Sequence, residues 1–318
     1  MGTEIPVAAE LADELLSFWH GIFGSNPDLT RGVLLGEEAA HNRNVLYMER
    51  SDDGPAGTCL LTVAEGAPTL GGFGEVATAP HLRRSGIASR LCGQAVEEFR
   101  AGGGRALFLG TGNGDAARVY HRLGWRKLAG ASVMALITDG DSPEAFLVDY
   151  FQPQADVAVR PASPRDRIPM IPLLQAPHDW QVLDVNAGMR STRYAVQSSC
   201  MGLYPRYEAV TTDGRGAWLS AETPDGRVVG MATARLKGAG CRVDGFAHAN
   251  NAGAWPTLMR AAMSWGAARG AVRSEAVVCV EDEDKRHRFE ALGFREAGVA
   301  DDVRVGDWAG AAVRLERG

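Results

Sequence analysis

The sequence contains no long apolar run. No stretch of about 18 apolar residues occurs, which argues against a membrane-spanning helix. The first residues, MGTEIPVAAELADELL, carry acids where a secretory signal needs a basic and then a continuously apolar region. These two observations predict a cytoplasmic protein with no membrane partner.

Lysine and cysteine are both scarce. Three residues are lysines, so nearly all of the 33 basic residues are arginines, a skew that favours a GC-rich bacterial genome. The five cysteines lie far apart and never form a CxxC arrangement. We therefore expect reduced, mostly buried thiols. The histidines show no metal-ligand spacing, so no metal is predicted.

The length and the net charge of the chain limit the classes of protein to which it can belong. A chain of 318 residues is long for one domain and sufficient for two domains of about 150 residues, each with its own core. The formal charge of −6 gives no general attraction to nucleic acid, whose binding depends on cationic contacts with phosphate. A globular, two-domain protein that does not bind nucleic acid is the expectation.

A short glycine-containing loop joins a strand-like segment to a helical one. Residues 83–89 read RRSGIAS, after VATAP and before the helical stretch LCGQAVEEF. A strand that runs through such a loop into a helix presents unpaired backbone N–H groups and the positive end of the helix dipole to one anion. The pattern predicts an anion site, and a pyrophosphate fits it best.

A second motif begins at Asn113, 27 residues after Gly86. The string NGDAARVYHRLGW fits an amphipathic helix that Gly124 closes at its C-cap. Together the motifs resemble the GNAT acetyltransferases, whose pattern is Val-x-Pro, then (Arg/Gln)-x-x-Gly-x-(Gly/Ala), then Asn-x-x-Ala-x-x-x-Tyr-x-x-x-Gly-(Phe/Trp). The matching positions are Thr78, Pro80, Arg83, Gly86, Ala88, Asn113, Ala116, Tyr120, Gly124 and Trp125.

The resemblance implies an N-acetyltransferase that moves an acetyl group from acetyl-CoA to the amine of a small molecule, by direct attack in a ternary complex. It implies that N–H groups of the glycine loop hold the pyrophosphate of coenzyme A, and that a strand and an asparagine bind the pantetheine arm. The protein would be a monomer or a homodimer. The cofactor-binding residues implied are Val76, Ala77, Thr78, Arg83, Arg84, Ser85, Gly86, Ile87, Ala88, Ser89 and Asn113.

Two residues are candidates for proton transfer. Tyr120 matches the general acid of the family, since a phenol can protonate a departing thiolate in a dry site. Its alternative role is packing of an amphipathic helix against the sheet. Glu75, on the strand before the loop, is the candidate general base, and its alternative is a solvated residue at a strand edge.

Helix and strand patterns alternate through both halves. Mixed elements in this order favour an α/β sheet covered on both faces. The resemblance implies an α/β fold of two tandem GNAT-like domains, each a mixed, mostly antiparallel twisted sheet flanked by helices. The predicted domains are residues 1–140, a linker at 141–156, and residues 157–318. In the first half, helices are predicted over 8–23 and 87–101 and over the Tyr120 motif, and strands over 44–49, 57–63, 72–79, 106–110 and 132–138.

The second half repeats the first without its cofactor motif. Aligning Leu91 with Leu258 places NNAGAW on the glycine loop, with Trp255 where only a small residue lets a pyrophosphate approach. Pro256 removes a possible donor. We therefore predict a degenerate second domain, and we interpret the acidic run EDED, residues 281–284, as a solvated loop.

A function of another class stays open. A chain that keeps the cradle but has no turnover would be a non-catalytic acyl-CoA-binding or assembly protein. Retention of Tyr120 argues against it.

Overall fold

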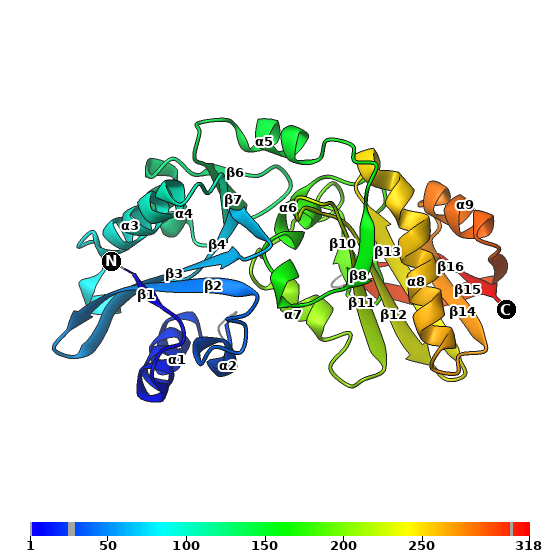
Figure 1. The fold of residues 1–318 in the computed structure, drawn as a ribbon, viewed down its shortest axis with the longest axis horizontal. Coiled ribbons are helices and arrows are strands. Elements are labelled where there is room, and N and C mark those ends of the chain that lie inside the picture. Colours follow the sequence, from blue (N-terminus) through cyan, green and yellow to red (C-terminus); the bar gives the residue numbers. More distant parts are fainter. Residues whose placement is uncertain (1, 25–28, 306–307) are drawn as a thin grey trace. The chain divides into compact units, whose positions relative to one another are not determined.

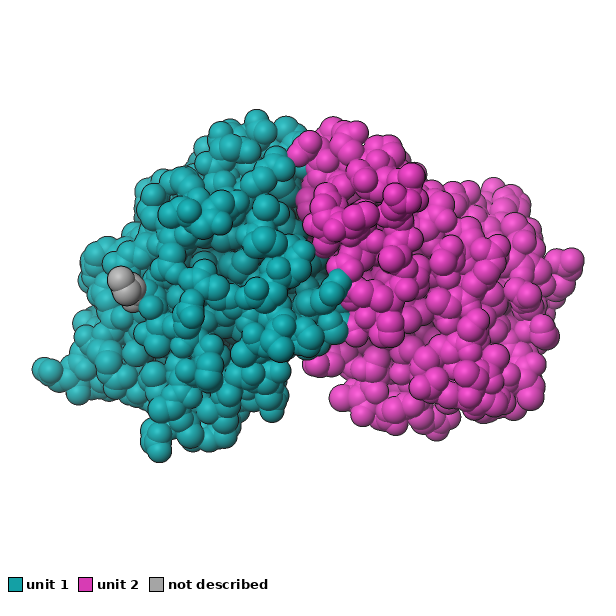
Figure 2. All heavy atoms as spheres, in the orientation of Figure 1, with its two compact units in different colours: residues 1–146, 163–171, 198–202 teal, residues 147–162, 172–197, 203–318 magenta. Residues whose placement is uncertain are grey.

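The computed structural model describes residues 2–24, 29–305 and 308–318 of the chain. The chain forms two compact units, coloured separately in Figure 2. The first unit comprises residues 1–146, 163–171 and 198–202, and the second comprises residues 147–162, 172–197 and 203–318. Short segments of the second half of the sequence thus belong to the first unit.

The first unit is built on a seven-stranded sheet in the order β1-β2-β3-β4-β5-β7-β6 (Figure 1). Neighbouring strands are antiparallel except for the parallel pair β4 and β5. The strands are β1 (Thr3–Glu4), β2 (Asn42–Ser51), β3 (Gly54–Ala64), β4 (Ala67–Thr78), β5 (Ala106–Gly110), β6 (Arg126–Lys127) and β7 (Val133–Ile137).

Helices cover both faces of this sheet. On one face, α3 packs Leu91, Ala95 and Phe99 into a core with Phe73 of β4. On the other face, α1 and α2 pack against Leu60 and other strand residues, as Figure 1 also shows. Apolar residues at helical spacing on α1 and α3 account for this burial. The helices are α1 (Ala9–Phe23), α2 (Arg31–Leu34), η1 (Pro80–Leu82), α3 (Ile87–Ala101), α4 (Gly114–Arg122) and α5 (Pro143–Tyr150), whose last residues belong to the second unit.

The second unit has a seven-stranded sheet with the same topology. Its order, β8-β11-β12-β13-β14-β16-β15, repeats that of the first, and its parallel pair, β13 with β14, corresponds to β4 with β5. A small sheet pairs β9 (Val182–Asp184) with β10 (Met189–Arg190). The large sheet contains β8 (Ala158–Pro161), β11 (Gly216–Glu222), β12 (Val228–Lys237), β13 (Gly240–Ala247), β14 (Arg273–Cys279), β15 (Arg295–Val305) and β16 (Trp308–Arg317).

The helix α8 (Trp255–Ala267) packs on β11, β12 and β13 as α3 packs in the first unit (Figure 1). Leu258, Met259 and Ala262 are among its buried residues. The other helices of the second half of the sequence are η2 (Pro164–Asp166), α6 (Met170–Gln175), α7 (Leu203–Glu208), η3 (Ala249–Ala254) and α9 (Glu283–Ala291).

The predicted fold class is confirmed, since both units are mixed, mostly antiparallel sheets flanked by helices. The helix predicted over 87–101 has those bounds, and the strand at 106–110 also agrees. All five cysteines are free and buried, as expected. The helix α5 was not predicted and lies within the expected linker. The division into domains at 1–140, 141–156 and 157–318 stays a prediction.

No helix in the described ranges is long and apolar enough to cross a membrane.

Candidate functional site

The strands β4 and β5 pair only over their first halves. Their parallel register ends at Gly72 and Phe108, and beyond these residues the two strands diverge. A cavity of about 1150 Å³ opens at this divergence. Its lining comes from β4, the loop before α3, the end of β5, the start of α4 and two other segments; these are residues 22–23, 73–78, 82–84, 86–89, 109–113, 115–116, 118–120, 122 and 198–200.

The glycine loop forms an anion cradle at one end of the cavity. Arg84 and Gly86 both have positive φ angles, 66° and 85°, so the chain turns sharply before α3. Gly86 is the N-cap of α3, and no described side chain caps this helix terminus. The first N–H groups of α3 are therefore open to an anion, which the helix dipole also favours.

Four arginines line the same cavity. Arg83 and Arg84 belong to the loop, while Arg118 and Arg122 lie one turn apart on α4. The side chain of Arg118 also pairs with Asp115 at 2.7 Å. The loop and the exposed face of α4 thus surround the cradle with positive charge, which suits a ligand with several phosphates.

A β-bulge in β4 sets the position of Glu75. Gly74 pairs with Leu60 and Ala77 with Thr58, so two residues of β4 oppose one of β3, and Glu75 has a φ angle of 51°. Two buried hydrogen bonds hold the bulge. The indole N–H of Trp19 donates to Thr58 Oγ1 at 2.9 Å, and the Thr58 hydroxyl donates to the Glu75 carbonyl at 2.6 Å.

This chain of bonds predicts a measurable cost for Thr58→Val. The variant leaves the Trp19 N–H and the Glu75 carbonyl without the hydroxyl they share, so we expect a loss of about 1–3 kcal/mol in the free energy of unfolding. Thr58→Ser keeps the hydroxyl and is the matched control. Denaturant unfolding of both variants measures the difference, and equal stability would show that the hydroxyl does not support the bulge.

Glu75 is a buried residue of the cavity wall. Its residue exposure is 8%, so the alternative of a solvated edge residue does not hold. The residue lines the cavity near the end of β4.

Tyr120 lies on α4 and also reaches the cavity from the protein interior. It is 6% exposed and packs at 6.1 Å from the ring of Trp125. Burial, with a smaller contribution from the thiols of Cys92, Cys59 and Cys200, raises the pKa of Tyr120 well above its ordinary value. The phenol therefore keeps its proton at neutral pH, as a proton donor must. The Tyr120 side chain therefore both packs in the protein core and lines the cavity.

Asn113 is the N-cap of α4. Its Oδ1 accepts hydrogen bonds from the N–H groups of Asp115 at 2.9 Å and Ala116 at 3.2 Å. This role fixes the start of the helix that carries Tyr120. The residue also lines the cavity, where its exposed amide NH₂ can donate to a ligand.

The structure brings nearly all the predicted site residues together. The candidate strand residues, the arginines, Gly86 to Ser89, Asn113, Tyr120 and Glu75 all line one cavity. Ser85 does not line it: its hydroxyl donates to the Leu82 carbonyl at 2.6 Å, and its own carbonyl accepts from Arg90. Sequence reasoning missed Arg118 and Arg122, which helical spacing could have indicated, and Ser198 to Cys200, for which no local signal exists.

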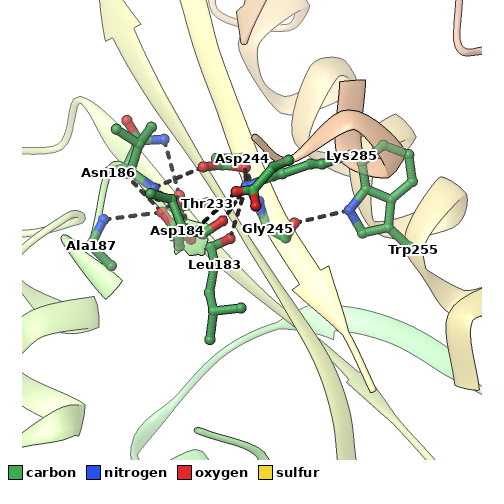
Figure 3. A network of polar contacts seen from close by, with 12 residues as sticks. Leu183, Asp184, Asn186, Ala187, Thr233, Asp244, Gly245, Trp255 and Lys285 are labelled. Carbon is green, nitrogen blue, oxygen red and sulfur yellow. Dashed lines mark hydrogen bonds and ion pairs between the residues drawn. The ribbon is translucent and has the colours of Figure 1, made fainter. Parts of the chain in front are cut away.

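In the second unit, the matching divergence of β13 and β14 is filled by protein. Trp255, at the start of α8, is 1% exposed, and its indole N–H donates to the Gly245 carbonyl at 2.9 Å (Figure 3). Its ring packs 5.0 Å from Phe289. The strand β9 lies beside β13, and Val182 of β9 packs on Cys279 of β14.

A buried ionic network fixes β9 in this position (Figure 3). The ammonium of Lys285 lies 2.6 Å from Asp244 Oδ1 and donates to the carbonyls of Val182 and Leu183 at 2.8 and 3.3 Å. Asp244 Oδ2 accepts from the Val185 N–H at 2.8 Å. Nearby, burial and the neighbouring Asp244 raise the pKa of Asp184 to about 7.

The interpretation of EDED as a solvated loop is wrong. Asp282 is 4% exposed, and its carboxylate accepts hydrogen bonds from the N–H groups of Gln181 at 2.6 Å and Val182 at 3.1 Å. Glu283 and Asp284 form the first turn of α9, where acids interact favourably with the helix dipole. The carboxylate partners lie a hundred residues away in sequence, beyond the reach of a local charge pattern.

Across the described ranges, no group of three or more His, Cys, Asp or Glu side chains is placed to hold a metal ion.

Several solved structures of acetyltransferases match about half of this chain. An acetyltransferase of the GNAT family from Streptococcus pneumoniae is 14% identical, over 51% of this chain and 98% of its own, with a TM-score of 0.39. A phosphinothricin acetyltransferase from Sinorhizobium meliloti, in complex with AcCoA, is 16% identical over 51% and 87%, with a TM-score of 0.40. Spermidine N-acetyltransferase from Vibrio cholerae, in complex with CoA and spermine, is 13% identical over 52% and 96%, with a TM-score of 0.38.

No curated protein sequence matches the chain significantly. The sequence profile described as the Acetyltransferase (GNAT) family matches residues 9–125. This range contains α1, the β4 bulge, the glycine loop and the Tyr120 helix. Residues 9–125 are therefore similar to the acetyltransferases of the GNAT family.

Proposed function

We propose that the first unit is an N-acetyltransferase that moves an acetyl group from acetyl-CoA to the amine of a small molecule, by direct attack in a ternary complex. The observation that carries the proposal is the convergence in one cavity of an uncapped helix N-terminus, a buried tyrosine and a buried glutamate. An anion cradle, a proton donor and a proton acceptor are the groups that aminolysis of a thioester requires.

The cavity fits coenzyme A as a co-substrate. The N–H groups at the start of α3 would hold its pyrophosphate, and the surrounding arginines would bind the remaining phosphate charge. Val76 to Thr78, past the bulge, have left the pairing with β5, so their backbone groups on that side can bond the pantetheine amides. When bound, acetyl-CoA supplies the acetyl thioester.

Proton transfer is assigned to the two buried side chains. The amine nitrogen forms a bond to the carbonyl carbon while the carbon–sulfur bond breaks. Tyr120 gives its proton to the leaving thiolate, since its raised pKa keeps the phenol protonated. Glu75 attracts the cationic amine and takes one of its protons, directly or through water, so that the neutral nitrogen can attack. The second proton, which the nitrogen loses as the amide forms, returns to Tyr120 and restores its hydroxyl.

We also propose that coenzyme A binds once per chain, in the first unit. In the second unit, Trp255, β9 and the Lys285 network fill the space at the divergence of β13 and β14. Lys285 lies eight residues before Gly293, as the small Ala116 lies eight before Gly124. A side chain of this length at that position leaves no room for a pantetheine arm.

A charge substitution tests the single site. Ser89 and Thr257 are each the third residue of a helix, α3 and α8, and a glutamate at this position stabilises a helix through its dipole. We expect Ser89→Glu to fold normally but to weaken coenzyme A binding at least about 100-fold, because its carboxylate repels the phosphates. Thr257→Glu is the matched control and should bind as the wild type does.

Calorimetric titration with coenzyme A provides the measurement. One site per chain in the wild type, lost only in Ser89→Glu, supports the proposal. Two equivalent sites, or equal weakening in both variants, would contradict it. Tight binding without any thiol release in the presence of amines would instead identify a non-catalytic acyl-CoA-binding protein.

A further inference from the structure

One part of the cavity wall comes from far along the sequence. Ser198, Ser199 and Cys200 line the cavity, whereas its other lining residues all lie between positions 22 and 122. These residues belong to the compact first unit, within its segment 198–202. Neither the family match nor the motifs of the first half assign a role to them.

Glycines of the sheet make room for this segment. A Cβ at Gly72 would lie 2.5 Å from Met201 Sδ, and one at Gly74 would lie 3.9 Å from Met201 Cγ. A Cβ at Gly110 would lie 3.3 Å from the Cys200 nitrogen. Met201 is 1% exposed, so it anchors the segment on β4 while the backbone of 198–200 covers the end of β5.

The segment lies on the sheet face opposite the coenzyme cradle. Side chains alternate along a strand, and Phe73, between Gly72 and Gly74, points into the core shared with α3. Gly72 and Gly74 therefore face away from α3, and so does Gly110, since its neighbour Leu109 belongs to the same core. The cradle is at the N-terminus of α3, so the two walls of the cavity belong to opposite faces.

We propose that residues 198–200, anchored by Met201, form the wall of the acceptor pocket and select the amine. This inference rests on the proposed function and extends it to specificity. The wall consists of small side chains, and Ser198 is exposed into the cavity. The hydroxyl of Ser198 can donate and accept hydrogen bonds, so the wall suits an amine that carries a further polar group, such as a hydroxyl, an amide or a second amine.

The first test is steric. In Ser198→Trp, the indole fills acceptor space, so the KM for the best acceptor in a panel of amines should rise at least about tenfold, while the Kd of acetyl-CoA stays within about twofold. Val196→Trp, at an exposed residue outside the described cavity lining, is the matched control and should change neither constant. An unchanged acceptor KM in Ser198→Trp overturns the proposal.

The second test needs no acceptor. Single cysteines are introduced by Ser198→Cys and by Ser89→Cys, and their alkylation by N-ethylmaleimide is followed by mass spectrometry, with the wild type as the background. Saturating acetyl-CoA should slow alkylation at position 89 at least about tenfold, because nearly every coenzyme site is then occupied. Alkylation at position 198 should slow less than about twofold. Equal protection at both positions places the segment on the coenzyme side and overturns the inference.

Failure of the proposed function and failure of the acceptor-wall inference give different results. Absence of protection at position 89, together with no heat of acetyl-CoA binding, rejects the proposed function itself. Protection at position 89 with equal protection at 198 rejects only the acceptor wall.

Discussion

Replacing Tyr120 by phenylalanine should lower the turnover number about 10²- to 10⁴-fold, the usual effect of removing a general acid. The Kd of acetyl-CoA should change little, because the hydroxyl acts only when the thiolate leaves. The ring stays in its packing position near Trp125 and Phe73, so stability is retained. Steady-state kinetics and calorimetry on the same preparation separate the two effects. A variant with the wild-type rate would restrict Tyr120 to packing.

The pH profile gives an independent check on the same residue. Burial raises the pKa of Tyr120, so the protonated, active form persists above the pH at which an exposed tyrosine ionises. The wild-type rate should therefore show no loss from this group between neutral pH and about pH 10. A fall of the rate in that range that disappears in Tyr120→Phe would contradict the assigned pKa direction.

Replacing Lys285 by methionine should destabilise the second unit by about 3–5 kcal/mol, because it leaves the carboxylate of Asp244 buried without its cation. It also removes the bonds to the Val182 and Leu183 carbonyls that hold β9. Hydrogen–deuterium exchange should rise within residues 181–187, where the N–H groups of residues 181, 182, 185, 186 and 187 donate to the carboxylates of Asp282, Asp244 and Asp184.

A second substitution tests whether the unpaired charge of Asp244 causes the faster exchange. Asp244→Asn in the Lys285→Met background removes the unpaired charge and keeps an oxygen for the N–H groups of Val185 or Gly245. Exchange at 181–187 should then return part of the way to the wild-type rate. Unchanged exchange in Lys285→Met alone would show that packing around Trp255, not the ion pair, holds β9.

The sequence was sufficient where the signal is local and periodic. The helix over 87–101 and the strand over 106–110 have their predicted bounds, because a helical apolar stripe and a short apolar run specify them. Repetition of the helix and strand patterns also indicated two similar folds, and both sheets have the same strand order. No helix was predicted within residues 141–156, yet α5 begins there at Pro143, because proline is well tolerated in the first turn of a helix.

Long-range features could not be predicted in this way. The burial of Asp282 depends on N–H groups of residues 181 and 182, and the position of Glu75 depends on a bulge held by Trp19 and Thr58. The 198–200 wall depends on three glycines that lie at least 88 residues earlier in the sequence. Each of these features arises from tertiary packing between distant segments, and the local sequence pattern of a segment does not indicate which other segment it contacts.

Acetyl transfer from acetyl-CoA to an amine by the first unit is tested most directly by a turnover measurement with acetyl-CoA and the amine panel. Coenzyme A thiol and N-acetylated amine are both quantified by mass spectrometry. We predict that the two products form in equal amounts over many turnovers, and that both are strongly reduced in Tyr120→Phe. Acetyl-CoA that binds to the protein yet remains intact with every amine would contradict the proposed function.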